Sequence, residues 1–286
     1  MSTDKNIVMI IFLLLSATAC SIQGNTGIAN LSDGQSQEKD ANSVDTILTR
    51  LKQKTTNIIS YQSELEYKFK QPLLESQTLR KGALYYQKFD DKSMLRVNFQ
   101  TLKQDDEKEQ KYPEHFIFDG IWLTRIDYQV KKTERRQLTE PNKPADPFEL
   151  ASREFPIIGF TKIEELKKQF EINLVQPVQT LTSSADSTQA EGYEKDEPKT
   201  SFHLHLKIKP DSIYKDDYTS IDFWVDKKSD LPVKIIAITT EDDIYEIKFL
   251  KPAVNKKIDE KIFKFDIPQN FTMEIIPLKS KESEEK

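Results

Sequence analysis

The feature that most constrains this chain is an alternation of apolar and polar residues with a period of two. In "SYQSELEYKFK" (60–70), Tyr61, Leu65, Tyr67 and Phe69 alternate with polar or charged side chains. Successive side chains of a β-strand point to opposite faces of the sheet. The pattern therefore predicts a strand with one apolar face and one charged face.

The same alternation recurs along most of the chain. It is found in "GALYYQKF", "SMLRVNFQTL", "EHFIFDGIWLTRIDYQV", "ERRQLTE", "SFHLHLKIKP", "YTSIDFWVD", "LPVKIIAITTED" and "IYEIKFL". Asp119-Gly120, between two apolar runs, is typical of a hairpin turn. Because the links are short, we predict an antiparallel sheet of about ten to eleven strands. The charged stretch "KQDDEKEQKYPE" is expected to extend one turn.

Helical spacing occurs in two places only. Val44, Ile47, Leu48 and Leu51 are spaced as on one helix face, and Ser43 is suited to cap that helix. The stretch 146–170 predicts one or two short helices, broken at Pro156 and Gly159. A sheet this large must curl on itself or be covered by a second layer. We therefore predict a mainly β (α+β) fold, an incomplete antiparallel β-barrel wrapped over short helices, with the 146–170 helices on its concave side.

The N-terminus has the plan of an export signal. An apolar run from Ile7 to Leu15 follows Lys5 and precedes the small residues Ala17-Thr18-Ala19. The run is too short to span a bilayer, so residues 1–19 are predicted to be a signal peptide. Cys20, the single cysteine, cannot form an internal disulfide. Residues 17–20 resemble a bacterial lipobox, which implies a diacylated Cys20; the alternative is ordinary cleavage, giving a soluble secreted protein.

These predictions divide the chain into four parts. After the signal peptide, residues 20–42 form a lipidated cysteine and a disordered tether, since they lack aromatic residues and periodicity. Residues 43–278 form the folded domain, and 279–286 are a charged tail. Ser21, instead of the Asp that favours the inner membrane, makes the outer membrane the preferred site. We expect a protein of the bacterial cell envelope, membrane-anchored through Cys20 and facing the periplasm.

Composition argues against several classes of function. A net charge of −5 gives no support for nucleic-acid binding. Glycines are few and do not cluster as a phosphate-binding loop requires, and no Gly-x-Ser-x-Gly motif is present. We expect no enzyme, no cofactor and no metal, and a monomer. His203 and His205 share a strand face but have no third ligand nearby, so they are expected to face solvent. "KKTERR" is expected to be a solvated turn near a hairpin or, alternatively, a patch for anionic lipid or a partner.

The order of these segments resembles the outer-membrane lipoprotein carrier superfamily (LolA/LolB-like, outer membrane lipoprotein-sorting proteins). The resemblance covers about residues 43–275. It rests on the first helix with "ISYQSELEYKFKQ", on "GALYY", "MLRVNF", "FIFDGIWLTRID" and "DPFELA", and on the ending "FLKPAVNKKIDEKIFKFDIPQNF". It implies an incomplete barrel whose hydrophobic cavity receives acyl chains. The family's basic position after the second strand is matched by Lys88, which lacks the planar fork of the usual Arg.

The apolar sheet face supplies the residues predicted to line that cavity. For each one, plain core packing is the alternative, and the functional prediction concerns the set. The lining set is Tyr67, Phe69, Leu84, Tyr86, Leu95, Val97, Phe99, Phe118, Trp122, Phe202, Leu204, Leu206, Ile221, Phe223 and Val225. A lid is predicted from Phe148, Phe155, Ile157, Ile158 and Phe160.

Three functions remain open at this stage. The first is an envelope lipoprotein that binds lipid or lipoprotein acyl chains, as a chaperone in lipoprotein transport and sorting to the outer membrane. The second is an envelope sensor or scaffold that uses the same fold to bind a protein partner. The third is a secreted hydrolase whose site the sequence does not reveal.

The anchor can be tested directly. Because stable membrane binding requires at least two acyl chains or an equivalent second signal, we expect Cys20→Ser to release the exported protein from the membrane fraction. Fractionation of cells expressing each form measures this. A wild-type protein that is freely soluble after export would contradict the lipoprotein assignment.

Overall fold

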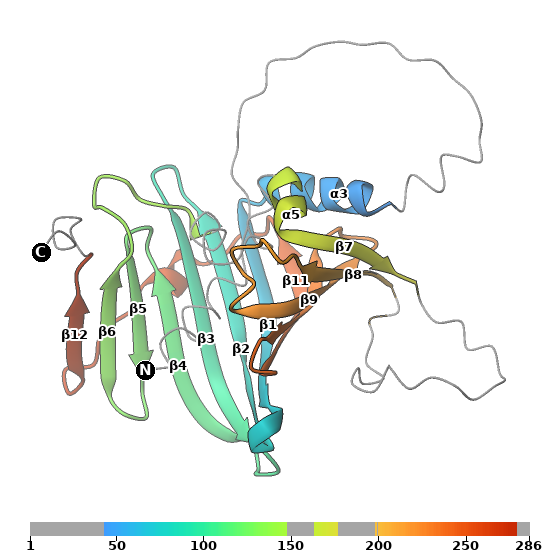
Figure 1. The fold of residues 1–286 in the computed structure, drawn as a ribbon. Helices are drawn as coiled ribbons and strands as arrows, with labels where there is room; N and C mark the ends of the chain where they lie inside the picture. The colour runs from blue at the N-terminus through green and yellow to red at the C-terminus, as the bar shows by residue number, and fades with distance from the viewer. Residues whose placement is uncertain (1–42, 148–162, 177–197, 199, 279–286) are drawn as a thin grey trace, which may run out of the picture.

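A computed structural model describes residues 43–147, 163–176, 198 and 200–278. In these residues twelve strands form a single sheet in the order β12-β6-β5-β4-β3-β2-β1-β11-β10-β9-β8-β7 (Figure 1). The two edge strands, β7 and β12, do not pair with each other, so the sheet is open. The predicted class, a mainly β, incomplete barrel-like sheet with short helices, is confirmed.

The elements follow the chain in two groups. The first group contains α3 (Val44–Thr56), β1 (Ser60–Gln71), η1 (Pro72–Leu74), β2 (Ser76–Lys88), β3 (Ser93–Gln104), β4 (Gln110–Phe118), β5 (Trp122–Asp127) and β6 (Lys132–Gln137). The second contains α5 (Ile163–Gln169), β7 (Phe170–Val175), β8 (Ser201–Ile208), β9 (Tyr218–Asp226), β10 (Pro232–Thr239), β11 (Ile244–Val254), η2 (Glu260–Phe263) and β12 (Thr272–Ile276).

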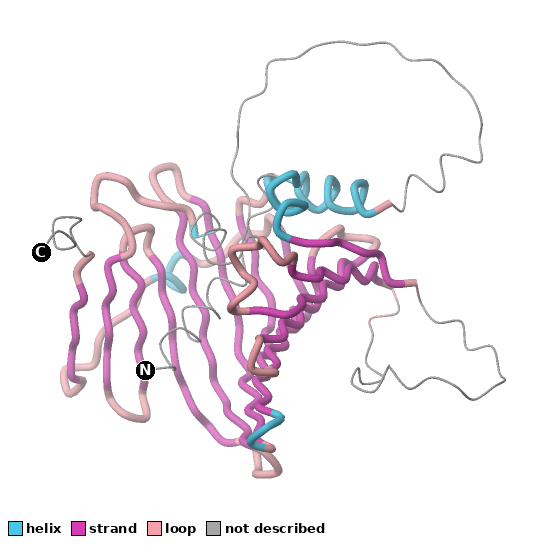
Figure 2. Tube along the Cα trace, in the orientation of Figure 1, coloured by secondary structure: helices cyan, strands magenta, loops and turns pink. Residues whose placement is uncertain are grey.

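The sheet bends sharply where the two groups meet. Figure 2 shows the strands β2 to β6 face-on and the strands β11 to β7 almost edge-on, with β1 between them. A bulge interrupts the pairing of β2 with β3 between Lys81 and Gly82. Gly82 lies so close to β3 that a Cβ atom would be 2.0 Å from the carbonyl oxygen of Asn98. Only glycine permits this close backbone approach.

Both described helices cover the concave side of the sheet. The Ser43 side chain caps α3 by accepting the N–H of Thr46 at 3.2 Å, as the sequence predicts. Ile47, Leu48 and Leu51 of α3 and Leu166 of α5 are buried in one cluster with the sheet residues. Figure 1 shows α3 and α5 side by side over the wing that contains β7 to β11.

Two local predictions were wrong, those for "KQDDEKEQKYPE" and "KKTERR". "KQDDEKEQKYPE" is mostly strand, because a tight turn with Asp105 at a φ of 46° lets β4 begin at Gln110. In the stretch predicted to be helical, 146–170, α5 ends at Gln169, and Phe170, Ile172 and Leu174 then alternate along β7 against β8. "KKTERR" is not a turn, since Lys132–Gln137 form β6 between β5 and β12.

A closing segment crosses the outer, convex face after β11. Arg96 of β3 donates hydrogen bonds to the carbonyl oxygens of Ile262 and Lys264 in this segment. Phe263 packs edge-on against Phe89, with ring centroids 6.0 Å apart. The crossing brings β12 beside β6 in a parallel orientation, the exception in an otherwise antiparallel sheet. Parallel pairing follows because the chain traverses the sheet before it pairs.

Candidate functional site

The candidate site is the inner face, the sheet face toward α3 and α5. Directly paired residues point to the same side, and here they form an apolar row across five strands. The row joins Tyr67 of β1, Ile247 of β11, Ile235 of β10, Phe223 of β9 and Leu204 of β8. All five side chains are buried. The inner face is therefore continuous across the bend of the sheet.

Of the predicted cavity residues, all except Trp122 occupy the inner face. Phe69 and Phe202 are partly buried there, and the others are buried. Trp122 points outward, where Arg135 lies 5.0 Å from its ring centroid. Phe118 pairs with Leu123, so the odd-numbered residues of β5 face inward. Sequence reasoning missed Phe116 and Tyr245, although both keep the period of two.

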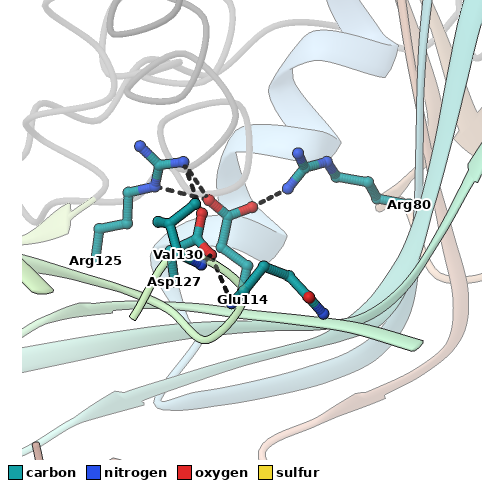
Figure 3. A network of polar contacts seen from close by, with 6 residues as sticks. Arg80, Glu114, Arg125, Asp127 and Val130 are labelled. Carbon is teal, nitrogen blue, oxygen red and sulfur yellow. Dashed lines mark hydrogen bonds and ion pairs between the residues drawn. The ribbon is translucent and has the colours of Figure 1, made fainter. Parts of the chain in front are cut away.

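A network of arginine and carboxylate side chains lies on the inner face (Figure 3). Glu114 of β4 is fully buried and binds two arginines from different strands. Arg125 of β5 donates from Nε at 2.7 Å and from Nη2 at 2.6 Å to Glu114 Oε1. Arg80 of β2 donates from Nη1 to the other oxygen, Oε2. Glu114 is thus a bridge between two guanidinium groups.

Asp127 completes the network from the end of β5. Its Oδ1 accepts the backbone N–H groups of Gln129 and Val130 at 2.9 and 3.2 Å, which fixes the turn to β6. Its other oxygen, Oδ2, is 3.6 Å from Nη2 of Arg125. The carboxylate therefore has mainly a structural role in the turn.

The two guanidinium groups lie over aromatic rings. Arg80 is 5.9 Å from the ring centroid of Phe99 and 5.4 Å from that of Tyr112, and Arg125 is 5.9 Å from that of Phe116. Burial lowers the pKa of Arg80, and Tyr112 partly offsets this. A guanidinium group nevertheless remains charged in proteins.

The strand phase of three charged residues in the sequence could have predicted this network. In "EHFIF", Glu114 occupies the same phase as Phe116 and Phe118, so it must share their face. Arg80 and Arg125 likewise fall in the inward phase of β2 and β5. A charged residue in the apolar phase of a strand requires a partner there, because a buried unpaired charge is strongly unfavourable.

The two histidines lie on the outer face, as expected, but not as free solvent-facing groups. His203 Nε2 and His205 Nδ1 are 2.7 and 2.9 Å from Oδ1 of the buried Asp222. Burial by itself would raise the pKa of Asp222, but the two histidine hydrogen bonds bring it below its usual value. Within the described residues, no group of three His, Cys, Asp or Glu side chains is placed to hold a metal ion.

Lys88 lies at the far end of β2 from Arg80. Its side chain is exposed, and its backbone N–H donates to the carbonyl oxygen of Ile59 at 2.8 Å. Eight residues of strand separate it from Arg80 by about 26 Å. A groove of about 930 Å³ opens beside this end, lined by residues 59–60, 87, 255–261 and 264.

Cys20 and the predicted lid residues Phe148, Phe155, Ile157, Ile158 and Phe160 lie outside the described residues. Among the residues that are described, no helix combines the length and the apolar character needed to cross a bilayer.

The fold defines the class of structure, an open antiparallel sheet curved over short helices. No protein-family model matches the sequence, and no curated protein sequence matches it either. Among solved structures, an uncharacterized conserved protein of Thermus thermophilus is 10% identical with a TM-score of 0.43, over 82% of this chain and 99% of that one.

Two further similar structures are of named proteins. The MucA/MucB complex of Pseudomonas aeruginosa matches at 10% identity and a TM-score of 0.42, over 77% of this chain and 60% of that one. A LolA superfamily protein of Nitrosomonas europaea matches at 11% identity and a TM-score of 0.30, over 78% and 98%. At this level of identity the likeness concerns the fold alone.

The bridging role of Glu114 predicts a stability effect. Glu114→Gln removes the negative charge that two partly buried guanidinium groups share. It should lower the free energy of unfolding by at least about 2 kcal/mol in urea titrations followed by circular dichroism. Glu109→Gln is the matched control, because the Glu109–Lys81 pair is exposed at 2.8 Å and should contribute less than about 1 kcal/mol. Equal losses of unfolding free energy in the two variants would contradict the bridging role of Glu114.

Proposed function

We propose that this chain is an envelope lipoprotein whose inner face binds the acyl chains of a lipid or lipoprotein, for lipoprotein transport and sorting to the outer membrane. The observation that carries the proposal is the unbroken apolar row from Tyr67 to Leu204. An acyl chain offers apolar contact along its whole length and needs no polar partner. In this account Cys20 anchors the protein, and the tether keeps the inner face close to the membrane.

Reversible binding requires that an acyl chain is not held too tightly. At about 0.8 kcal/mol per buried methylene, a fully buried chain of about sixteen carbons would gain about 13 kcal/mol. We propose that the predicted lid residues, which lie outside the described part of the chain, compete with the ligand for the inner face and offset part of this gain; they are Phe148, Phe155, Ile157, Ile158 and Phe160. Binding and release, without chemical change, are what an apolar face offers; the carboxylates near it, Glu114 and Asp127, are already hydrogen-bonded.

A second function, binding of a protein partner, is favoured by one observation. The edge strand β12 exposes Met273 and Ile275, with 48% and 57% of their surface accessible. An open strand edge can pair with an extended peptide. A sensor or scaffold would use this edge, whereas a lipid carrier would use the inner face.

Phe69→Glu tests the lipid proposal. Phe69 stacks on Tyr245 at 4.7 Å on the inner face and is only partly buried, so a charge there should spare the fold. We expect the affinity of the Cys20→Ser chain for a fluorescent fatty acid to fall at least about tenfold, which corresponds to about 1.4 kcal/mol. A fluorescence titration, with circular dichroism as the check of folding, measures the effect.

The matched control is Gln62→Glu, which adds the same charge to the outward phase of the same strand. It should leave the affinity unchanged. If Phe69→Glu and Gln62→Glu bind the fatty acid equally well, the acyl chain does not lie on the inner face.

A further inference from the structure

We propose that Arg80 and Arg125 form a subsite for an anionic head group, a carboxylate or phosphate, of an amphiphile whose acyl chain lies on the inner face. The inference rests on the proposed function and deepens it, because it names the chemical class of the ligand. Figure 3 shows the two guanidinium groups reaching toward Glu114 from opposite sides.

The subsite lies where the apolar row ends. Arg80 pairs directly with Tyr67, so it is the next inward-facing residue after the row that runs from Leu204 to Tyr67. Arg125 pairs with Phe116 and lies on the same face. A ligand extended along the row would therefore place its polar end at the arginine pair.

The network has more N–H donors than carboxylate oxygens that can accept them. Both oxygens of Glu114 already accept hydrogen bonds from arginine, and Oδ1 of Asp127 accepts two backbone N–H groups. A guanidinium group has five N–H donors. Among the described residues, Arg80 donates one hydrogen bond, to Glu114, and its side chain keeps 22% of its surface exposed. The network thus has donors to spare, which suits a ligand that only accepts.

The surroundings strengthen an ionic contact at this place. The rings of Phe99, Tyr112 and Phe116 flank the two guanidinium groups and exclude part of their water. Charge-assisted hydrogen bonds from arginine are stronger where water is excluded. Burial also lowers the pKa of Arg80.

Head-group chemistry follows from these donors. Carboxylate and phosphate oxygens match the planar fork of arginine and can accept two parallel hydrogen bonds. An uncharged glycerol ester accepts only weaker hydrogen bonds and carries no negative charge to pair with arginine. The site should therefore distinguish amphiphiles with the same acyl chain by the charge of the head group.

The test compares myristate with monomyristin, its uncharged glycerol ester, by calorimetric titration of the Cys20→Ser chain. Wild type should bind myristate at least about tenfold more tightly. Arg80→Gln should abolish this preference while leaving monomyristin within about twofold, because Arg125 alone still holds Glu114 through two hydrogen bonds. Arg80→Lys should restore only part of the preference, since it keeps the charge and loses the fork.

Arg135→Gln is the matched control, because it removes the same charge from the outer face beside Trp122; it should keep the wild-type preference. Acetate and inorganic phosphate, titrated alone, identify a site for free anions, and phosphate binding with no contribution from the acyl chain would overturn the inference. Equal affinity of wild type for the two probes, or an unchanged preference in Arg80→Gln, would overturn it as well. Failure to bind either probe would overturn the proposed function and this inference with it.

Discussion

The whole architecture depends on the pairing of β1 with β11. These strands are far apart in the sequence, yet Leu65 lies opposite Phe249 and Tyr67 opposite Ile247. Without this pairing, the strands from β12 to β1 and those from β11 to β7 would be two separate sheets, each with an exposed apolar face. Joining them creates one continuous apolar face. Asn255, with a φ of 53°, ends the pairing by accepting the backbone N–H of Ile59 at 2.7 Å.

The second constraint is the placement of charge beside that apolar face. A fully buried carboxylate such as Glu114 is tolerated only when its charge is compensated, and Arg80 of β2 and Arg125 of β5 compensate it from either side of β4. Replacing such a network by apolar residues often stabilises a protein. In the proposed function, the N–H donors of Arg80 that do not bind Glu114 bind the head group of the ligand.

Much of the fold could be predicted because strand periodicity is local. The alternation in "SYQSELEYKFK" places Tyr67 and Phe69 inward without knowledge of the partner strand. Pairing between distant segments could not be predicted: β12 lies beside β6 only because the chain crosses the sheet after β11. The prediction that Trp122 faces inward was wrong for a related reason. The length of the turn after Phe118 decides which residues of β5 face inward. The Asp222 bridge to His203 and His205 also requires the register of two strands.

The central claim is that the inner face holds an acyl chain. Native mass spectrometry of the Cys20→Ser chain, exported to the bacterial envelope and purified without detergent, tests it most directly. The account predicts a population whose added mass is that of an acyl lipid and which loses that mass on extraction with organic solvent. A protein that shows only the mass of its polypeptide, or one found only in complex with another protein, would contradict it.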